Sequence, residues 1–150
     1  MDAIDKKILA ELQKDGRLSL TDLSEKVGLS LSPCHRRVKT LEESGVIQGY
    51  RAELDASQLG LNFSAIVFVT MKEGDKKSVL GFEDAISEIP EIIQAQRLFG
   101  NPDYMLHVVT RDLSSFQKLY DEHLSAIMGV QRLTSTIVMK NVVLNRPLPL

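Results

Sequence analysis

The stretch that decides the fold of the N-terminal half is SPCHRRVKTLEESGVI, residues 32–47. Cys34, Val38 and Leu41 recur in it at spacings of four and three, which places them on one face of a helix. Pro33 suits the first turn of that helix, where a missing N–H costs nothing. The stretch therefore predicts a helix with one apolar face, which packs inward, and one basic face.

Two shorter helical patterns precede this stretch. Apolar residues repeat at helical spacing over residues 4–12 and again over 19–27. Gly16 is expected to end the first helix in a left-handed cap, and Gly28 to end the second. Residues 46–54 then read as a short hairpin around a glycine. Three helices with tight turns, followed by such a wing, predict a winged helix-turn-helix.

The third helix is the expected DNA reader. The major groove admits one α-helix, and Arg, Lys, Ser and His can each contact base edges or phosphates there. Ser30 or Ser32 is expected to cap this helix. A solvated basic helix without a nucleic-acid partner is the alternative. The residues expected to contact DNA are Ser30, Ser32, Pro33, His35, Arg36, Arg37 and Lys39.

The charge of the chain supports this reading only weakly. The formal net charge is −2, whereas DNA-binding domains are often basic. Residues 1–51 hold nine Lys and Arg against eight Asp and Glu, a balance of +1. Residues 52–150 hold nine against twelve, a balance of −3, and the two sums give −2. The N-terminal half is therefore the better candidate for a polyanionic partner.

The periodicity changes in the second half of the chain. Runs rich in β-branched and aromatic residues alternate there with amphipathic helical runs. Their order, β-α-β-β-α-β, is that of a ferredoxin-like sandwich, so the fold class is α+β. The expected organisation is a winged helix-turn-helix over 1–54, a linker over 55–62 and a ferredoxin-like domain over 63–150. The expected elements of that domain are strands over 63–71, 92–99, 104–110 and 130–144, and helices over 76–89 and 113–128.

The predicted sheet has apolar residues on both faces. On its first strand, Ala65, Val67 and Val69 share one side, while Ile66 and Phe68 share the other. Two helices on one side of a sheet cover only one of these faces. An apolar second face predicts a further cover, and we expect another copy of the chain to provide it.

Several stretches of the N-terminal half match one known family. They are IDKKIL at 4–9, QKDGR at 13–17, LSEKVGLS at 23–30 and SPCHRRVKTLE at 32–42, followed by GVI at 45–47. The family's DNA-binding domain carries such stretches at this spacing.

The second half continues the match. GNPDY at 100–104 looks like the family's G-x-x-D-Y turn, and GV at 129–130 leads to TST at 134–136 as in its last strand. The chain thus resembles the leucine-responsive/asparagine-regulator (Lrp/AsnC) family of bacterial and archaeal transcription factors. The resemblance implies a regulator that senses amino acids or related metabolites. It also implies that the C-terminal domain drives dimerisation, often onward to octamers.

The resemblance also implies where an effector binds. In the family it lies between sensor domains, near the turn and the last strand. Asp103 would then pair with an amino group, and hydroxyls of the last strand would add contacts. From composition alone the turn and the strand hydroxyls also suit purely structural roles. The expected effector residues are Gly100, Asn101, Pro102, Asp103, Tyr104, Thr134, Ser135 and Thr136.

Other classes of function have less support. The sequence shows no nucleophile–base pair or metal-ligand spacing, so we expect no catalytic residue, no metal and no cofactor beyond the effector. Alternatives are an amino-acid-sensing protein without gene regulation and a small ferredoxin-like hydrolase. The single cysteine, Cys34, suits a reducing cytoplasm. No signal peptide or membrane span is expected, since the chain lacks a long apolar run.

Overall fold

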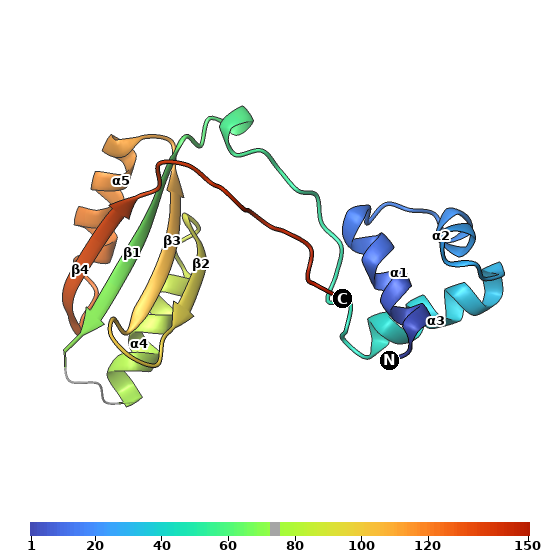
Figure 1. The fold of residues 1–150 in the computed structure, drawn as a ribbon. Helices are drawn as coiled ribbons and strands as arrows, with labels where there is room; N and C mark the ends of the chain where they lie inside the picture. Colours follow the sequence, from blue (N-terminus) through green and yellow to red (C-terminus); the bar gives the residue numbers. More distant parts are fainter. Residues whose placement is uncertain (73–75) are drawn as a thin grey trace. The chain divides into compact units, whose positions relative to one another are not determined.

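The structure, a computed structural model, describes residues 1–72 and 76–150, and the chain divides into two compact units. The first unit comprises Met1–Glu53 together with Val142–Leu150, and the second comprises Leu54–Asn141. The ribbon in Figure 1 traces both. The sequence assigns the last residues to the second domain instead. A contact far along the chain, described next, accounts for the grouping of Val142–Leu150 with the first unit.

The C-terminal segment is held by the first helix of the first unit. The side-chain amide of Gln13 donates to the Leu148 carbonyl oxygen at 3.1 Å and accepts from the Leu148 N–H at 2.6 Å. The two bonds satisfy both polar groups of one backbone residue. Gln13 and Leu148 are 135 residues apart in the sequence, so no local sequence pattern predicts this contact.

The first unit is a three-helix bundle, as predicted. Its helices are α1 (Ala3–Lys14), α2 (Leu20–Val27) and α3 (Leu31–Glu43). Each helix contributes its apolar face to one core, which confirms the periodicity found in the sequence. The buried residues of this core are Ile8, Leu23, Val27, Cys34, Val38 and Leu41.

The helix ends follow the predicted signals in part. The Ser19 hydroxyl accepts the Asp22 N–H at 3.0 Å and caps α2, and Gly28 ends it with φ 75°. Gly16, however, is not a left-handed cap, because α1 ends at Asp15 in an extended conformation. A Cβ at Gly16 would lie 3.4 Å from the Tyr50 ring, so the glycine serves close packing instead.

The start of α3 settles the choice of its cap. The helix begins at Leu31, so Ser30 is the N-cap residue, and its side chain forms no capping hydrogen bond. Ser32 and Pro33 both lie in the first turn. The prediction for Pro33 is therefore confirmed, and the alternative that Ser32 caps the helix is wrong.

The predicted hairpin after α3 does not form. Residues 46–54 contain no strand and run as an irregular segment. Contacts to α3 replace strand pairing: the Ile47 N–H donates to the Leu41 carbonyl at 3.0 Å, and the Tyr50 hydroxyl donates to Glu42 at 2.9 Å. Anchoring to the preceding helix thus fixes this segment in place of a hairpin ladder.

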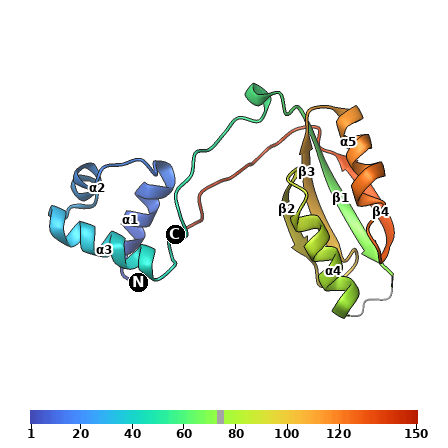
Figure 2. The same cartoon turned by 180° about the vertical axis from the view of Figure 1, so that it is seen from behind.

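The second unit is a four-stranded antiparallel sheet in the order β2-β3-β1-β4. The two helices cover one face of the sheet, which Figures 1 and 2 show from opposite sides. This arrangement confirms the ferredoxin-like prediction. The elements are β1 (Phe63–Met71), α4 (Lys76–Ser87), β2 (Ile92–Arg97), β3 (Tyr104–Thr110), α5 (Leu113–Leu119), a π-helical turn (Tyr120–Leu124) and β4 (Val130–Ile137).

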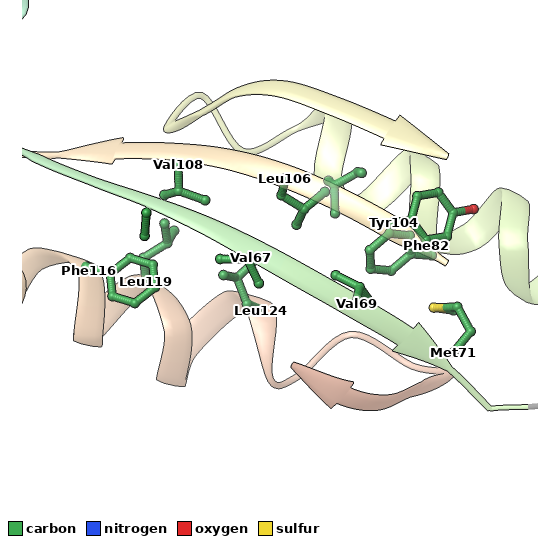
Figure 3. Packing of buried hydrophobic residues seen from close by; sticks show 12 residues of the cluster. Val67, Val69, Met71, Phe82, Tyr104, Leu106, Val108, Phe116, Leu119 and Leu124 are labelled. Atoms are coloured by element: carbon green, nitrogen blue, oxygen red, sulfur yellow. The ribbon is translucent and has the colours of Figure 1, made fainter. Parts of the chain in front are cut away.

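The core of the second unit lies between the sheet and the helices, as Figure 3 shows. Val67 and Leu106 of the two central strands are fully buried. Phe82 of α4 packs on Tyr104, with ring centroids 4.6 Å apart. Since inward residues alternate along β1 and β3, the predicted division into two faces is confirmed, and Ala65, Val67 and Val69 form the inner one.

Four predicted elements are too long, and one of them is α4, which ends at Ser87 rather than at residue 89. The last strand ends at Ile137 because its partner β1 begins at Phe63 and offers no ladder beyond Val138. The last helix widens into the π-helical turn, where the Ser125 N–H donates to the Tyr120 carbonyl. β2 likewise stops at Arg97, before the turn. No helix of the described residues is long and apolar enough to cross a membrane.

Candidate functional sites

The exposed face of α3 is the first candidate site. Ser32, His35, Arg36 and Lys39 lie at helical spacings of three, one and three, and all four are exposed. Cys34, Val38 and Leu41 hold the opposite face in the core. The helix therefore presents a polar, basic stripe while the bundle fixes its inner side, which is the geometry of a groove-reading helix.

Most of the stripe is available to a ligand. Within the described residues, no hydrogen bond or ion pair engages the side chain of His35 or Arg36. Lys39 lies 3.8 Å from Glu43 in an exposed pair, which contributes little and is readily exchanged. Ser30 is exposed just before the stripe, and Pro33 is half-buried at its edge.

Arg37 differs from its neighbours. Its guanidinium donates to Asp2 at 2.8 Å and to Asp5 at 3.0 Å. The two carboxylates raise the pKa of Arg37, and the cap bond to Asp5 N–H and the pairing with Arg37 lower the pKa of Asp2. In the structure Arg37 is thus paired with two carboxylates, unlike the exposed Arg36 next to it. The sequence did not identify Asp2 and Asp5 as partners of Arg37, because acidic residues are common at the start of any helix.

The turn between β2 and β3 is the second candidate site. It contains Gly100, Asn101, Pro102 and Asp103, and its Asn101–Pro102 peptide bond is cis. Asp103 fastens this turn to the neighbouring strand: its carboxylate accepts the Met71 N–H at 2.7 Å. One oxygen of the Asp103 carboxylate thus has a structural role.

Tyr104 also has a structural role. Only 2% of it is exposed, and its hydroxyl donates to Glu83 at 2.9 Å. The same carboxylate oxygen accepts from Arg97 Nε at 2.6 Å, and this pairing lowers the pKa of Glu83. Burial, followed by the bond to Glu83, raises the pKa of Tyr104. Tyr104 therefore stays a neutral donor that ties β3 to α4.

A cavity of about 320 Å³ lies beside the turn. Its lining combines the Asp103 carboxylate with the cationic side chains of Lys72 and Arg97 and with apolar groups. The Asp103 carboxylate and the Lys72 ammonium supply the two charges that an amino-acid zwitterion requires, whereas Arg97 is already paired with Glu83. Sequence reasoning missed Lys72 and Arg97, although each charge lies at or just beyond a strand end. The remaining lining residues are Met71, Val79, Leu98 and Tyr104.

The predicted residues of the last strand lie elsewhere. Thr134 pairs with Phe68 and Thr136 with Ile66, so both threonines share the face that the helices leave open. Ser135 pairs with Val67 and points to the other side of the sheet. Since β1 separates β4 from β3, one copy of the chain does not bring these hydroxyls to the turn.

Metal binding has no support in the described part of the chain. No group of three or more His, Cys, Asp or Glu side chains gathers there in a way that could hold a metal ion.

Comparison with known proteins gives the family. The model of the Lrp/AsnC ligand binding domain matches residues 64–148, and a winged helix-turn-helix DNA-binding model matches residues 1–48. The chain belongs to the Lrp/AsnC family. It is 41% identical over 150 residues to the Bkd operon transcriptional regulator of Pseudomonas aeruginosa, covering 100% of this chain and 98% of that one. It is also 40% identical over 142 residues to the leucine-responsive regulatory protein of Rhizobium meliloti, covering 95% and 91%.

Solved structures of this family share the fold. A transcriptional regulator of Neisseria meningitidis, solved as a complex with L-Met, matches with a TM-score of 0.95 at 34% identity, covering 99% of this chain and 96% of that one. An AsnC family regulator of Agrobacterium tumefaciens matches with a TM-score of 0.94 at 32% identity, covering 99% and 97%. The predicted family and fold class are therefore confirmed, with the local correction of the wing given above.

Proposed function

We propose that this chain is a homo-oligomeric, sequence-specific DNA-binding transcriptional regulator whose second unit binds a free amino acid or a related metabolite. The observation that carries the proposal is the exposed stripe of α3 on a helix-turn-helix, within a chain of the Lrp/AsnC family. The curated relatives are named as regulators, and the proposal includes no catalytic step.

In this proposal, α3 enters the major groove. Arg36 reads a guanine edge or holds a phosphate, Lys39 contacts the backbone, and Ser32 and His35 donate or accept at base edges. Ser30 and Pro33, at the start of the helix, lie closest to the groove floor when the N-terminal end of a reading helix points inward. Two copies would read half-sites about 10 bp apart, or multiples of that spacing.

The DNA test uses full-length variants. Arg36→Ala and Lys39→Ala are expected to weaken binding to an operator selected from random-sequence duplexes by the wild-type protein. A lost phosphate contact lowers affinity for every sequence and reduces the salt slope by about one, whereas a lost base contact relaxes specificity. Lys118→Ala removes the same charge from the second unit and serves as the control. Wild-type binding by both α3 variants would refute the proposed reader.

The effector part of the proposal rests on the cavity beside the turn. The ammonium group of an amino acid would pair with Asp103, and its carboxylate with Lys72 or with Arg97. Gly100 and Asn101 of the same turn are not among the described residues that line this cavity. The complex of the Neisseria relative with L-Met supports an amino acid as the ligand. Thr134, Ser135 and Thr136 would join only through a neighbouring copy.

The effector test is calorimetry with each of the twenty amino acids. At least one is expected to release heat with wild-type protein, and Asp103→Asn should weaken that binding by about tenfold or more, since it removes the charge but keeps a hydrogen-bond acceptor. Asp121→Asn, an exposed change on the π-helical turn, is the control. Absence of heat with every amino acid would refute an amino-acid effector.

The open face of the sheet supports the homo-oligomer. Ile66 and Phe68 of β1 and Met105 and Val109 of β3 are half-buried there, and the strand register brings them together. A second copy that stacks on this face would remove them from water. Onward assembly to octamers would then set the spacing of the reading helices. An effector changes DNA binding if it binds two such assembly states unequally.

A further inference from the structure

Arg37 lies on the flank of α3, away from the exposed stripe. It is five residues after Ser32, and its side chain is 29% exposed, whereas Arg36 beside it is an exposed residue. The helical geometry turns Arg37 about 100° from Arg36, towards the side on which α3 meets α1. A residue on this flank reaches the groove only if its side chain is free to swing outward.

The side chain is not free. A single nitrogen, Nη1, donates both to Asp2 Oδ2 at 2.8 Å and to Asp5 Oδ1 at 3.0 Å. The other oxygen of Asp2 accepts the Asp5 N–H at 2.9 Å and caps α1. One carboxylate therefore ends α1 and also orients α3. We call these three residues the Asp2–Asp5–Arg37 cluster.

The cluster offers no net attraction to DNA. Two carboxylates and one guanidinium carry a formal charge of −1, and the pairing lowers the pKa of Asp2 while it raises that of Arg37, so this pair stays ionised near neutral pH. A phosphate that captured Arg37 would have to displace an aspartate. It would leave that aspartate unpaired next to the polyanion, and like charges in proximity repel.

The cluster does fix the rotation of α3. Cys34, Val38 and Leu41 hold the inner side of the helix through apolar contacts, which are not directional. Hydrogen bonds are directional, and those of the cluster join positions 35 and 32 residues apart in the chain. Bonds to base edges are directional and carry the sequence information, whereas phosphate contacts carry none directly.

We propose that Arg37 contacts no DNA and is a positioning residue, which sets the rotation of α3 on α1 through Asp2 and Asp5 and thereby sets sequence selectivity. The proposal rests on the DNA-binding function proposed above and removes Arg37 from the residues that would contact DNA. Arg36 belongs to the reader, and Arg37 belongs to the support of the reader.

The test measures two quantities on full-length variants: the ratio of affinities for a wild-type-selected operator and a scrambled duplex, and the salt slope. We expect Arg37→Gln and Asp5→Asn each to lower the affinity ratio by about tenfold, the size of one lost base contact, with the slope unchanged. Their double variant should lose no more than Arg37→Gln alone, because Arg37→Gln already breaks the bond that Asp5→Asn removes. Arg37→Lys keeps the charge and one bond, so it should recover part of the ratio.

The opposite outcomes are distinct. If Arg37 held a phosphate, Arg37→Gln would reduce the salt slope by about one, and Asp5→Asn would tighten binding to both duplexes by releasing the arginine. If the cluster only stabilised the fold, both variants would lower the active fraction and the melting temperature but leave the affinity ratio unchanged. Either result would overturn the proposal.

Arg36→Ala separates this inference from the proposed function. If Arg36→Ala leaves binding to both duplexes as in the wild type, the DNA reader itself has been misassigned. If Arg36→Ala weakens binding while the Arg37 and Asp5 variants keep the wild-type affinity ratio, only the positioning role is wrong.

Discussion

The two units of the chain bury their apolar residues in different ways. In the first, three helices enclose one core, and α3 presents polar and basic side chains outward. In the second, the helices cover one face of the sheet and leave Ile66 and Phe68 half-buried on the other. The first unit is thus built to meet a polar, charged partner. The second leaves an apolar face open, which a copy of the chain covers in the proposal above.

The largest expected effect tests whether the two cores are separate. Phe82→Ala removes a ring that is 1% exposed in the second core, and such truncations cost about 3–5 kcal/mol. Residue-resolved hydrogen exchange should show lost protection in β1 and β3 but not in α1–α3. Ile8→Ala, in the first core, is the matched variant and should give the reverse pattern at a cost of about 2–5 kcal/mol. Loss of protection in both units from either change would show that they fold as one.

A charge on the open face tests the contrast directly. Phe68→Arg places a cation at a site that we expect a second copy to cover, so the oligomer should dissociate while the sheet remains folded. Sedimentation velocity would show a smaller particle with an unchanged far-UV circular dichroism spectrum. Gln117→Arg, on the exposed side of α5, adds the same charge and should leave the assembly intact. An unchanged oligomer in the Phe68 variant would place the interface elsewhere.

A smaller effect concerns the caps of the first unit. Ser19→Ala removes the bond to the Asp22 N–H and should destabilise the unit by about 1 kcal/mol. Ser30→Ala, at the α3 cap position without such a bond, should cost less. Urea unfolding of both variants measures the difference. Equal losses would mean that the Ser19 bond contributes nothing.

The smallest effect is a pH dependence of the second unit. His107 lies on the open face and shares a hydrogen bond of 2.7 Å with Ser64, and burial lowers its pKa. Its neutral form is therefore favoured in the folded state, so stability is present above the ordinary histidine pKa of about 6.5 and is lost as the pH falls through the lowered value. His107→Gln should flatten the decline of the urea midpoint between neutral and mildly acidic pH. If the urea midpoint of the variant declined as steeply as that of the wild type, titrating groups other than His107 would cause the pH dependence.

The sequence predicted what depends on local spacing. The phase of Cys34, Val38 and Leu41 gave the buried side of α3, and alternation along 63–71 gave the two faces of β1. These patterns act within one element, where side-chain direction follows from backbone geometry alone. The element order then limited the second unit to a ferredoxin-like arrangement, and the motif spacing led to the right family.

Tertiary structure alone decided which distant groups meet. It paired Arg37 with Asp2 and Asp5, joined the C-terminal segment to Gln13 and ended β4 where β1 begins. It also formed a cavity in which Lys72 and Arg97 accompany Asp103. The physical reason is that hydrogen bonds and ion pairs depend on distances set by the packing of whole elements. A sequence therefore shows that a charge is present, but only the fold determines which group it pairs with.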